Sequence, residues 1–235
     1  MRMRFFLPAL AIMTATGCDS ALQTEPVDRV PVDQAIIDGA GARAALIGAY
    51  DALQDLSYYG TDLLVLGDLS ADNAEHVGTY QYLGQVDRNQ LQSDNTAVTG
   101  LWESIYAAIG RTNLVLARVP DVPGLADAER NQILGEAHFL RALHYHNLVK
   151  FWGGVPMPLA PVKSAAEAAA FTRASVDEVY TQIIADLDRA EQLMTNDSQT
   201  RQASLGAVAA LRARVLLYKG DWAGAEAAAD KVLGM

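Results

Sequence analysis

Apolar residues recur at three- and four-residue intervals along most of the chain after residue 31, and this spacing predicts α-helices. The clearest example is 175–194, where Ser175 and Glu178 also form the S-x-x-E pattern of a capping box. We therefore predict an all-α fold. Further helices are expected at 35–56, 101–119, 126–151, 203–219 and 222–233.

The last two predicted helices form a hairpin. Gly220 suits the position just after a helix, and Asp221 suits the N-cap of the next one. The hairpin resembles a tetratricopeptide repeat, with the small residues Ala225 and Ala229 allowing close packing. No strict repeat period runs through the chain. We therefore predict stacked antiparallel helix pairs, TPR-like, with a long inserted loop at 57–97.

The N-terminus has the pattern of an export signal. A positive start is followed by an apolar run at 5–15, which is too short to span a bilayer. The segment 15–18 then resembles a bacterial lipobox and ends in Cys18, the only cysteine of the chain. An ordinary signal peptide with an incidental cysteine is the alternative.

The lipobox interpretation divides the chain into three parts. We predict a lipoprotein signal peptide at 1–17, a lipidated Cys18 with a polar tether at 18–31, and a helical domain at 32–235. The acyl chains on Cys18 would bind the membrane through buried methylene groups, without a transmembrane helix.

Composition and net charge argue against some classes of binding partner. The chain has 235 residues, of which 51% are hydrophobic and 20% charged, values that suit a globular protein. Its net charge of -10 repels phosphate backbones, so we predict no nucleic-acid partner. The same negative charge argues against binding to anionic lipid by electrostatic attraction alone.

The inventory of reactive side chains argues against catalysis. The four histidines lack metal-site spacing, because His144 and His146 are two residues apart and face different directions on a helix. We expect the histidines at the surface or at interfaces. No phosphate-binding loop or nucleophile elbow is present. A hydrolytic carboxylate pair stays open on sequence alone. We predict a non-catalytic protein without a metal or cofactor.

The predicted long loop carries the candidate ligand residues Asp72, Asn73, Tyr80 and Tyr82. Aromatic faces stack on sugar rings, and carboxylates and amides bond the hydroxyls; long loops in compact domains are often functional. The alternative is that the tyrosines pack the loop onto the helices with their hydroxyls exposed. That alternative stays open for Tyr80 and Tyr82.

Other aromatic residues are expected to be structural. We favour the packing role, with exposed hydroxyls, for Tyr58 and Tyr59, because they lie near a helix end. Trp102 and Trp222 occupy helix-packing positions and are predicted to belong to the core. Trp152 stands at a turn, where both roles are open.

The segment 135–156, which we call the signature segment, is predicted to be a helix that runs into a Gly-Gly turn and stops at a proline. Its core positions are expected to be Phe139, Leu140, Leu143 and Leu148, with Arg141 pairing with a carboxylate or bonding a carbonyl. The segment resembles that of the SusD/RagB outer-membrane lipoproteins. The residues that carry the resemblance are Glu136, Ala137, Phe139, Leu140, Arg141, Ala142, Tyr145, Leu148 and Phe151-Trp152-Gly153-Gly154-Val155-Pro156.

The resemblance implies a non-catalytic lipoprotein of the outer membrane, on the surface or the periplasmic face. Such proteins capture glycans or other nutrients for a SusC-like, TonB-dependent β-barrel transporter. The resemblance covers only the N-terminal part of that family, so we expect a truncated SusD-like domain. An alternative is a TPR-type envelope lipoprotein that acts as a protein scaffold. The inserted loop and the turn at 151–156 favour the first interpretation.

Overall fold

A computed structural model describes residues 35–195 and 201–234. The predicted signal peptide, Cys18 and the tether lie outside the described residues, as does most of the predicted turn at 195–198. The predicted domain boundaries therefore stay predictions.

The described chain is helical, as predicted. Its long helices are α2 (Gly39–Asp51), α5 (Thr96–Arg118), α6 (Asp127–Trp152), α8 (Val176–Leu193), α9 (Leu205–Lys219) and α10 (Trp222–Leu233). Short helical segments are η2 (Ala52–Gln54), η3 (Leu56–Gly60), α3 (Asp62–Ser70), α4 (Gln81–Asp87), η4 (Val119–Asp121) and α7 (Ala165–Ala170). Within these described ranges the β-type pairing is a single antiparallel bridge between Pro156 and Arg173.

Local signals in the sequence set several helix ends. Ser175 and Glu178 form the predicted capping box at the start of α8. Gly220 ends α9 in the left-handed conformation with φ +84°, which glycine adopts without a Cβ penalty. The Asp221 carboxylate accepts a hydrogen bond of 3.0 Å from the Gly224 amide and caps α10. All three predictions are confirmed.

The α9–α10 hairpin packs through small residues, but not quite the predicted pair. Ala225 and Ala228 are buried, whereas Ala229 is exposed. Ala225 and Ala228, three residues apart, lie on the same face of α10. Trp222 was predicted to lie in the core and is 68% exposed, so that prediction is wrong.

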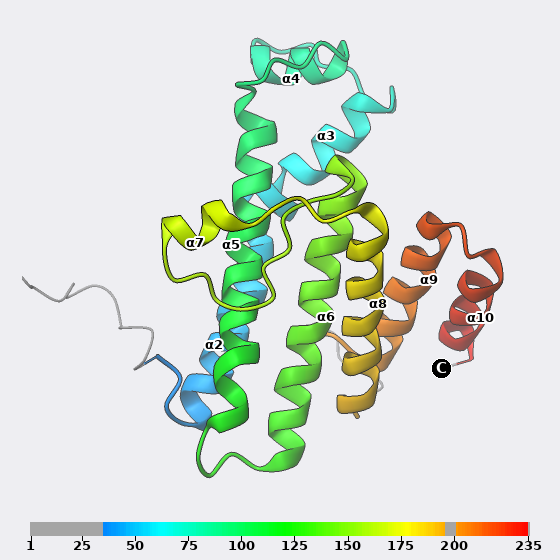
Figure 1. Ribbon diagram of the computed structural model, residues 1–235. Helices are drawn as coiled ribbons and strands as arrows, with labels where there is room; N and C mark the ends of the chain where they lie inside the picture. The colour runs from blue at the N-terminus through cyan, green and yellow to red at the C-terminus, as the bar shows by residue number, and fades with distance from the viewer. Residues whose placement is uncertain (1–34, 196–200, 235) are drawn as a thin grey trace, which may run out of the picture.

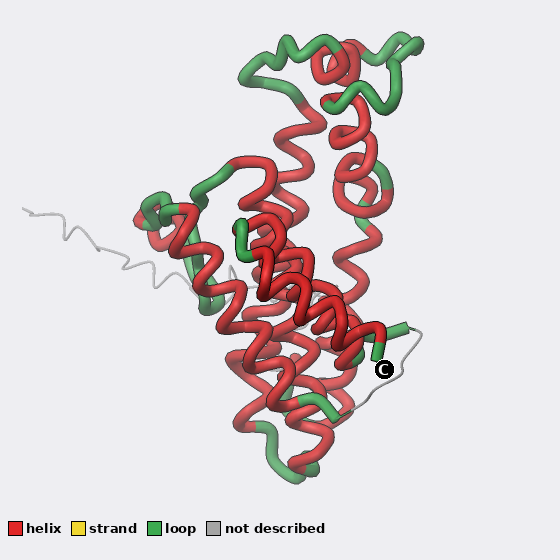
Figure 2. The backbone as a smooth tube through the Cα atoms, turned by 90° about the vertical axis from the view of Figure 1, so that its right-hand side faces the viewer, coloured by secondary structure: helices red, strands yellow, loops and turns green. Residues whose placement is uncertain are grey.

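The predicted loop at 57–97 is not a simple loop, since it contains α3 and α4. Leu63, Leu66 and Leu69 repeat at three-residue intervals and are buried on one face of α3, which explains the helix. We call residues 61–95 the α3–α4 excursion. Figures 1 and 2 place α4 at one end of the molecule, beyond the main helices.

Helix α6 lies at the centre of the bundle. It runs antiparallel to α5 and packs against α2 and α5 on one side and α8 on another (Figure 1). Its buried residues cover most of its circumference, as expected for a central helix. Leu140 and Leu148 are fully buried, and Phe139 and Leu143 pack against the core, as predicted.

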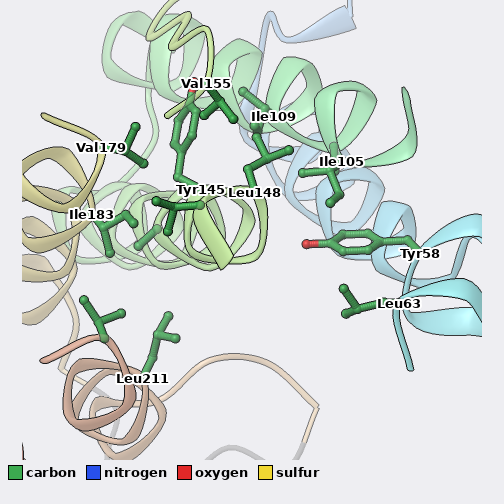
Figure 3. Close-up of a cluster of buried hydrophobic side chains, with 14 of the residues drawn as sticks. Tyr58, Leu63, Ile105, Ile109, Tyr145, Leu148, Val155, Val179, Ile183 and Leu211 are labelled. Carbon is green, nitrogen blue, oxygen red and sulfur yellow. The ribbon is translucent and has the colours of Figure 1, made fainter. Parts of the chain in front are cut away.

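The core forms two clusters that meet along α6. The larger cluster joins α3, α5, α6, α8 and α9. Figure 3 shows side chains from these helices converging, with Tyr145 and Leu148 of α6 between Ile109 on one side and Ile183 on the other. The smaller cluster joins α2, α5 and α6.

Candidate functional site

The signature segment ends α6 with a backbone turn that requires glycine. Gly153 has φ +69°, in the region that favours glycine. A Cβ on Gly154 would lie 2.2 Å from the carbonyl oxygen of Ala174, so only glycine fits there. The Ala174 amide also donates to the Val155 carbonyl at 3.0 Å. The chain therefore leaves α6 in one fixed direction.

Polar side chains of α5 and α6 then hold the extended segment 156–160 in place. Each donates to a backbone carbonyl that no helix or sheet would otherwise satisfy. The donors and acceptors are Tyr106 to Pro156 at 2.6 Å, Tyr145 to Pro158 at 2.7 Å, Asn113 to Pro158 at 2.9 Å and Arg141 to Leu159 at 3.0 Å.

Arg141 is also the centre of a buried ion pair. Its guanidinium contacts both carboxylate oxygens of Asp186 on α8, at 2.9 and 2.7 Å, and the His138 ring lies 2.7 Å from the same carboxylate. Burial alone would raise the pKa of Asp186, but the hydrogen bonds from His138 and Arg141 outweigh it and lower the pKa. Both predicted roles of Arg141 are confirmed.

A second buried network joins α6 to α2 and α9. The Glu136 carboxylate accepts from Tyr50 at 2.7 Å and from Gln132 at 2.8 Å, and the Tyr50 hydroxyl accepts from the Ala203 amide at 2.8 Å. Burial raises the pKa of Glu136, although the hydrogen bonds from Gln132 and Tyr50 oppose this. These contacts fix the start of α9 against α2.

Two histidines of α6, His144 and His146, are both 0% exposed, so of the two predicted placements, surface or interface, they do not occupy the surface. They lie at interfaces, His144 against Tyr58 and His146 against Tyr180 and Tyr218. The reason is that α6 is buried on several faces, so that residues two apart both point into protein. The His144 ring bonds the Tyr58 hydroxyl at 2.9 Å. Burial lowers the pKa of each histidine to about 3, with Lys150 and Arg214 adding to the effect at His146.

Tyr58 and Tyr59 of η3 pack the start of the predicted 57–97 loop onto α6, and their hydroxyls form hydrogen bonds there. Asn147 of α6 donates its amide to the hydroxyls of Tyr58 at 2.8 Å and Tyr59 at 3.0 Å. Tyr58 is fully buried, so the prediction of an exposed hydroxyl is wrong for it. The amide of Asn147 needed acceptors, and the tyrosines supply them.

Asp72 and Asn73 lie exposed just after the C-terminal end of α3. Asp72 has φ +55°, and the Asn73 amide donates to the Asp68 carbonyl at 3.0 Å, so the backbone turns sharply there. Both side chains point to solvent rather than into the core.

Tyr80 and Tyr82 lie at the start of α4 and contact each other, with ring centroids 5.6 Å apart. Tyr80 is 62% exposed, while Tyr82 is half-buried against the core. Asn95 anchors this region, because its amide donates to the Tyr82 carbonyl at 2.8 Å while its oxygen caps α5. Within the described residues, no hydrogen bond joins either tyrosine to Asp72 or Asn73.

A groove that the sequence did not reveal runs between α5 and the segment 156–171. Its volume is about 1360 Å³, and Trp102, Tyr106 and Phe171 contribute aromatic walls. The ring centroids of Trp102 and Tyr106 lie 4.8 Å apart. Those of Trp102 and Trp152 lie 5.1 Å apart, and these two rings meet edge-on. The spacing of Trp102 and Tyr106, four residues apart on one helix, was the signal in the sequence that could have indicated an aromatic surface here.

Comparisons with known proteins identify the family. The model of SusD-like proteins described as "Starch-binding associating with outer membrane" matches residues 33–217. The chain belongs to this SusD-like family, as its signature segment predicted.

Individual relatives agree with this result. SusD-like protein P38 of Formosa agariphila is 28% identical over 229 residues, which are 97% of this chain and 44% of that protein. SusD-like protein P2 of the same organism is 31% identical, covering 90% of this chain and 42% of that protein. The chain thus spans less than half the length of the curated relatives it matches.

Solved structures show the same fold. A structure titled "Laminarin binding SusD-like protein" has a TM-score of 0.74 and 28% identity, and covers 84% of this chain and 44% of that one. A SusD superfamily protein from Bacteroides vulgatus has a TM-score of 0.77 at 22% identity, and covers 83% of this chain and 43% of that one. The second likeness concerns the fold alone.

Two kinds of feature are absent from the part of the chain that the structure describes. In residues 35–195 and 201–234, no helix combines the length and apolar character needed to cross a bilayer. The same part of the chain contains no group of three or more side chains suited to bind a metal ion.

Proposed function

We propose that this protein binds glycans without catalysing a reaction on them. The observation that carries the proposal is a pair of packed rings on a SusD-like scaffold, the exposed Tyr80 and the half-buried Tyr82. Paired aromatic rings offer flat apolar faces to the C–H surfaces of sugars, and their hydroxyls remain available as donors and acceptors.

Asp72 and Asn73 complete the proposed ligand set. Both are exposed at the C-terminal end of α3, and their carboxylate and amide can bond sugar hydroxyls. Within residues 35–195 and 201–234 neither side chain forms a hydrogen bond, so a ligand would not have to displace a side-chain contact there. The groove beside Trp102 and Tyr106 is a second candidate surface, with a volume of about 1360 Å³.

The family and the N-terminal pattern support a proposed role in nutrient uptake at the outer membrane. The family description places its members with the outer membrane. We propose that Cys18 carries the lipid anchor and that the protein passes its ligand to a TonB-dependent β-barrel partner. In this mechanism the protein supplies stacking and hydrogen bonds, and the partner supplies transport.

Glycan binding is tested with a panel of immobilised oligosaccharides that contains neutral members, such as laminaritetraose and maltotetraose, and acidic members. The wild-type protein is compared with a Tyr80→Ala, Tyr82→Ala double variant and with Trp102→Ala. Binding lost only in the double variant supports the predicted set. Binding lost only in Trp102→Ala moves the site to the groove. No binding to any glycan contradicts the function.

The scaffold alternative has its own supporting observation. The α9–α10 hairpin exposes Leu217, Tyr218, Trp222 and Leu233, which are 50%, 58%, 68% and 85% exposed. Leu217, Tyr218 and Trp222 lie where α9 passes into α10, and exposed apolar side chains gathered in this way are typical of protein contacts. A mild-detergent pulldown of the lipidated protein from its native membranes, followed by mass spectrometry, separates the two roles. Stoichiometric recovery of a TonB-dependent barrel supports uptake, and recovery of envelope assembly factors without a barrel supports the scaffold.

A further inference from the structure

Two positively charged side chains lie next to Tyr218, because the Lys150 Nζ lies over its ring and Arg214 precedes it by one turn on α9. Lys150 is in the last turn of α6, and Arg214 is in the second half of α9. Figure 1 shows the C-terminal ends of α6 and α9 toward the same end of the bundle. Within the ranges that the structure describes, neither residue forms an ion pair. Burial is the main reason that the pKa of Lys150 is lowered, and the positive charge of Arg214 lowers it further.

Aromatic rings surround these two charges. The Lys150 Nζ lies 5.8 Å from the ring centroid of Tyr218, a ring that is 58% exposed. Tyr59 of η3 is half-buried nearby. Burial raises the pKa of its hydroxyl, and the hydrogen bond from Asn147 and the charge of Arg214 oppose that rise. We call Tyr59, His146, Lys150, Arg214 and Tyr218 the cation–aromatic cluster.

The third feature is a buried side chain without partners. His146 is 0% exposed, and neither of its ring nitrogens has a hydrogen-bond partner in the described structure. Its ring meets that of Tyr218 edge-on, with centroids 5.3 Å apart and an interplanar angle of 86°. A neutral imidazole carries one N–H donor, and here the protein offers it no acceptor.

These features distinguish the cluster from ordinary basic residues at the surface. Arg173 and Arg201 are also exposed and unpaired in the described chain, but no aromatic ring packs on either of them. In the cluster, two like charges and an unpartnered imidazole converge within a protein of net charge -10. A bound anion would offset the repulsion between the two positive charges.

We propose that Lys150 and Arg214 together bind the carboxylate or sulfate group of an acidic saccharide, whose ring stacks on Tyr218. The guanidinium of Arg214 suits two-point contact with either anion, and the ammonium of Lys150 adds a point charge. The choice of a saccharide as the carrier of the anion rests on the proposed glycan-binding function. The site is separate from the α3–α4 excursion and adds a preference for charge.

The test uses defined probes on the full chain. Calorimetric titrations measure tetragalacturonate, which carries carboxylates, and κ-neocarratetraose, which carries sulfates, against neutral galactotetraose and laminaritetraose. We expect at least one acidic probe to bind at least about tenfold tighter than the neutral probes, and to weaken as sodium chloride is added. The Lys150→Gln, Arg214→Gln double variant is expected to lose this preference by about tenfold.

The matched control is the Arg173→Gln, Arg201→Gln double variant, which removes the same net charge elsewhere on the surface. It is expected to keep the acidic preference, because a general electrostatic attraction would fall equally in both variants. Thermal unfolding checks folding. Removing two mutually repelling charges is expected to leave the melting temperature unchanged or slightly higher.

The outcomes separate the two proposals. If neutral probes bind as well as acidic ones, or if the acidic preference survives Lys150→Gln with Arg214→Gln, the cluster is not an anion site while glycan binding stands. If the control variant loses as much of the acidic preference as the cluster variant, the preference comes from overall electrostatic attraction and not from the cluster. Absence of binding to any oligosaccharide, here and on the glycan panel, rejects the glycan function and this site together. A marked loss of stability in the cluster variant would show an internal partner and overturn the proposal.

Discussion

Helix α6 and the α3–α4 excursion use polar and aromatic residues in opposite ways. On α6, Glu136, Arg141, His144 and Asn147 are buried, and each has protein partners at hydrogen-bond distance. In the excursion, Tyr80 is exposed and its hydroxyl has no partner in the described chain.

The difference separates residues that build the scaffold from residues that remain available to a ligand. A buried polar group without its partner costs the full penalty of desolvation, so the α6 residues are committed to the fold. An exposed ring carries no such penalty and can be used for binding. The following predictions test this contrast, from the largest expected effect to the smallest.

Arg141→Ala is expected to cause the largest loss. It leaves the buried Asp186 carboxylate without its bidentate partner, which costs about 3–5 kcal/mol of unfolding free energy. Urea denaturation followed by circular dichroism measures the change. The control is Arg111→Ala, whose ion pair with Asp51 is half-exposed and is expected to contribute less than about 1 kcal/mol. Equal losses in the two variants would contradict the assigned role of α6.

Acid is expected to destabilise the bundle through its buried histidines. The folded pKa values of His144 and His146 are about 3, below the unfolded value of 6.5, so the unfolded state binds more protons as pH falls below 6.5. At pH 5.5 each histidine therefore reduces the unfolding free energy by about 1.4 kcal/mol relative to pH 7.5. The raised pKa of Glu136 acts in the opposite direction at lower pH.

Urea midpoints at pH 7.5 and 5.5 measure this dependence. His146→Phe provides the comparison, because His146 has no hydrogen bond to lose, and it is expected to remove about half of the pH effect. A wild-type protein equally stable at both pH values would show that these histidines are not buried in the neutral form.

Tyr58→Phe deletes a hydroxyl that is buried against α6, and Tyr80→Phe deletes an exposed hydroxyl of the excursion. The Tyr58 hydroxyl bonds His144 and Asn147, so its removal is expected to cost about 1–3 kcal/mol. The Tyr80 hydroxyl is exposed, and its removal is expected to change stability by less than about 0.5 kcal/mol. Chemical denaturation of the pair gives the difference directly. Similar values would remove the distinction between scaffold and excursion.

Tyr80→Ala is expected to have a small effect on stability and a larger effect on binding. The ring is 62% exposed, so its loss is expected to change the unfolding free energy by less than about 0.5 kcal/mol. Loss of one stacking face is expected to weaken glycan binding by about tenfold, or about 1.4 kcal/mol. Titration with a glycan identified on the panel measures this, and unchanged affinity would remove Tyr80 from the ligand set.

Much of the fold could be predicted because its signals are local. The capping box of Ser175 and Glu178 and the glycine at 220 are read from a few neighbouring residues. The long helices follow from apolar spacing, and α6 was predicted within about two residues of its observed ends. The excursion was mistaken for a loop because α3 and α4 are short and their stability depends on packing.

The candidate site, too, could be predicted only in part. The residue types of Asp72, Asn73, Tyr80 and Tyr82 could be selected from sequence, but their exposure could not. The groove beside Trp102 depends on where the segment 156–171 crosses α5, and no local signal specifies that crossing. Trp222 was assigned to the core because its spacing suits a helix, yet its side chain faces away from α9.

The sequence by itself therefore determined the long helices, several of their caps, the glycine turn after α6 and the family, since each depends on contiguous residues. Only the tertiary structure decided which polar residues are committed to the fold and which remain free. His144 and Tyr58 are 86 positions apart, and so are Tyr50 and Glu136. Whether such groups are buried and partnered depends on helices that meet only after folding, because burial is a property of the assembled surface rather than of a local pattern.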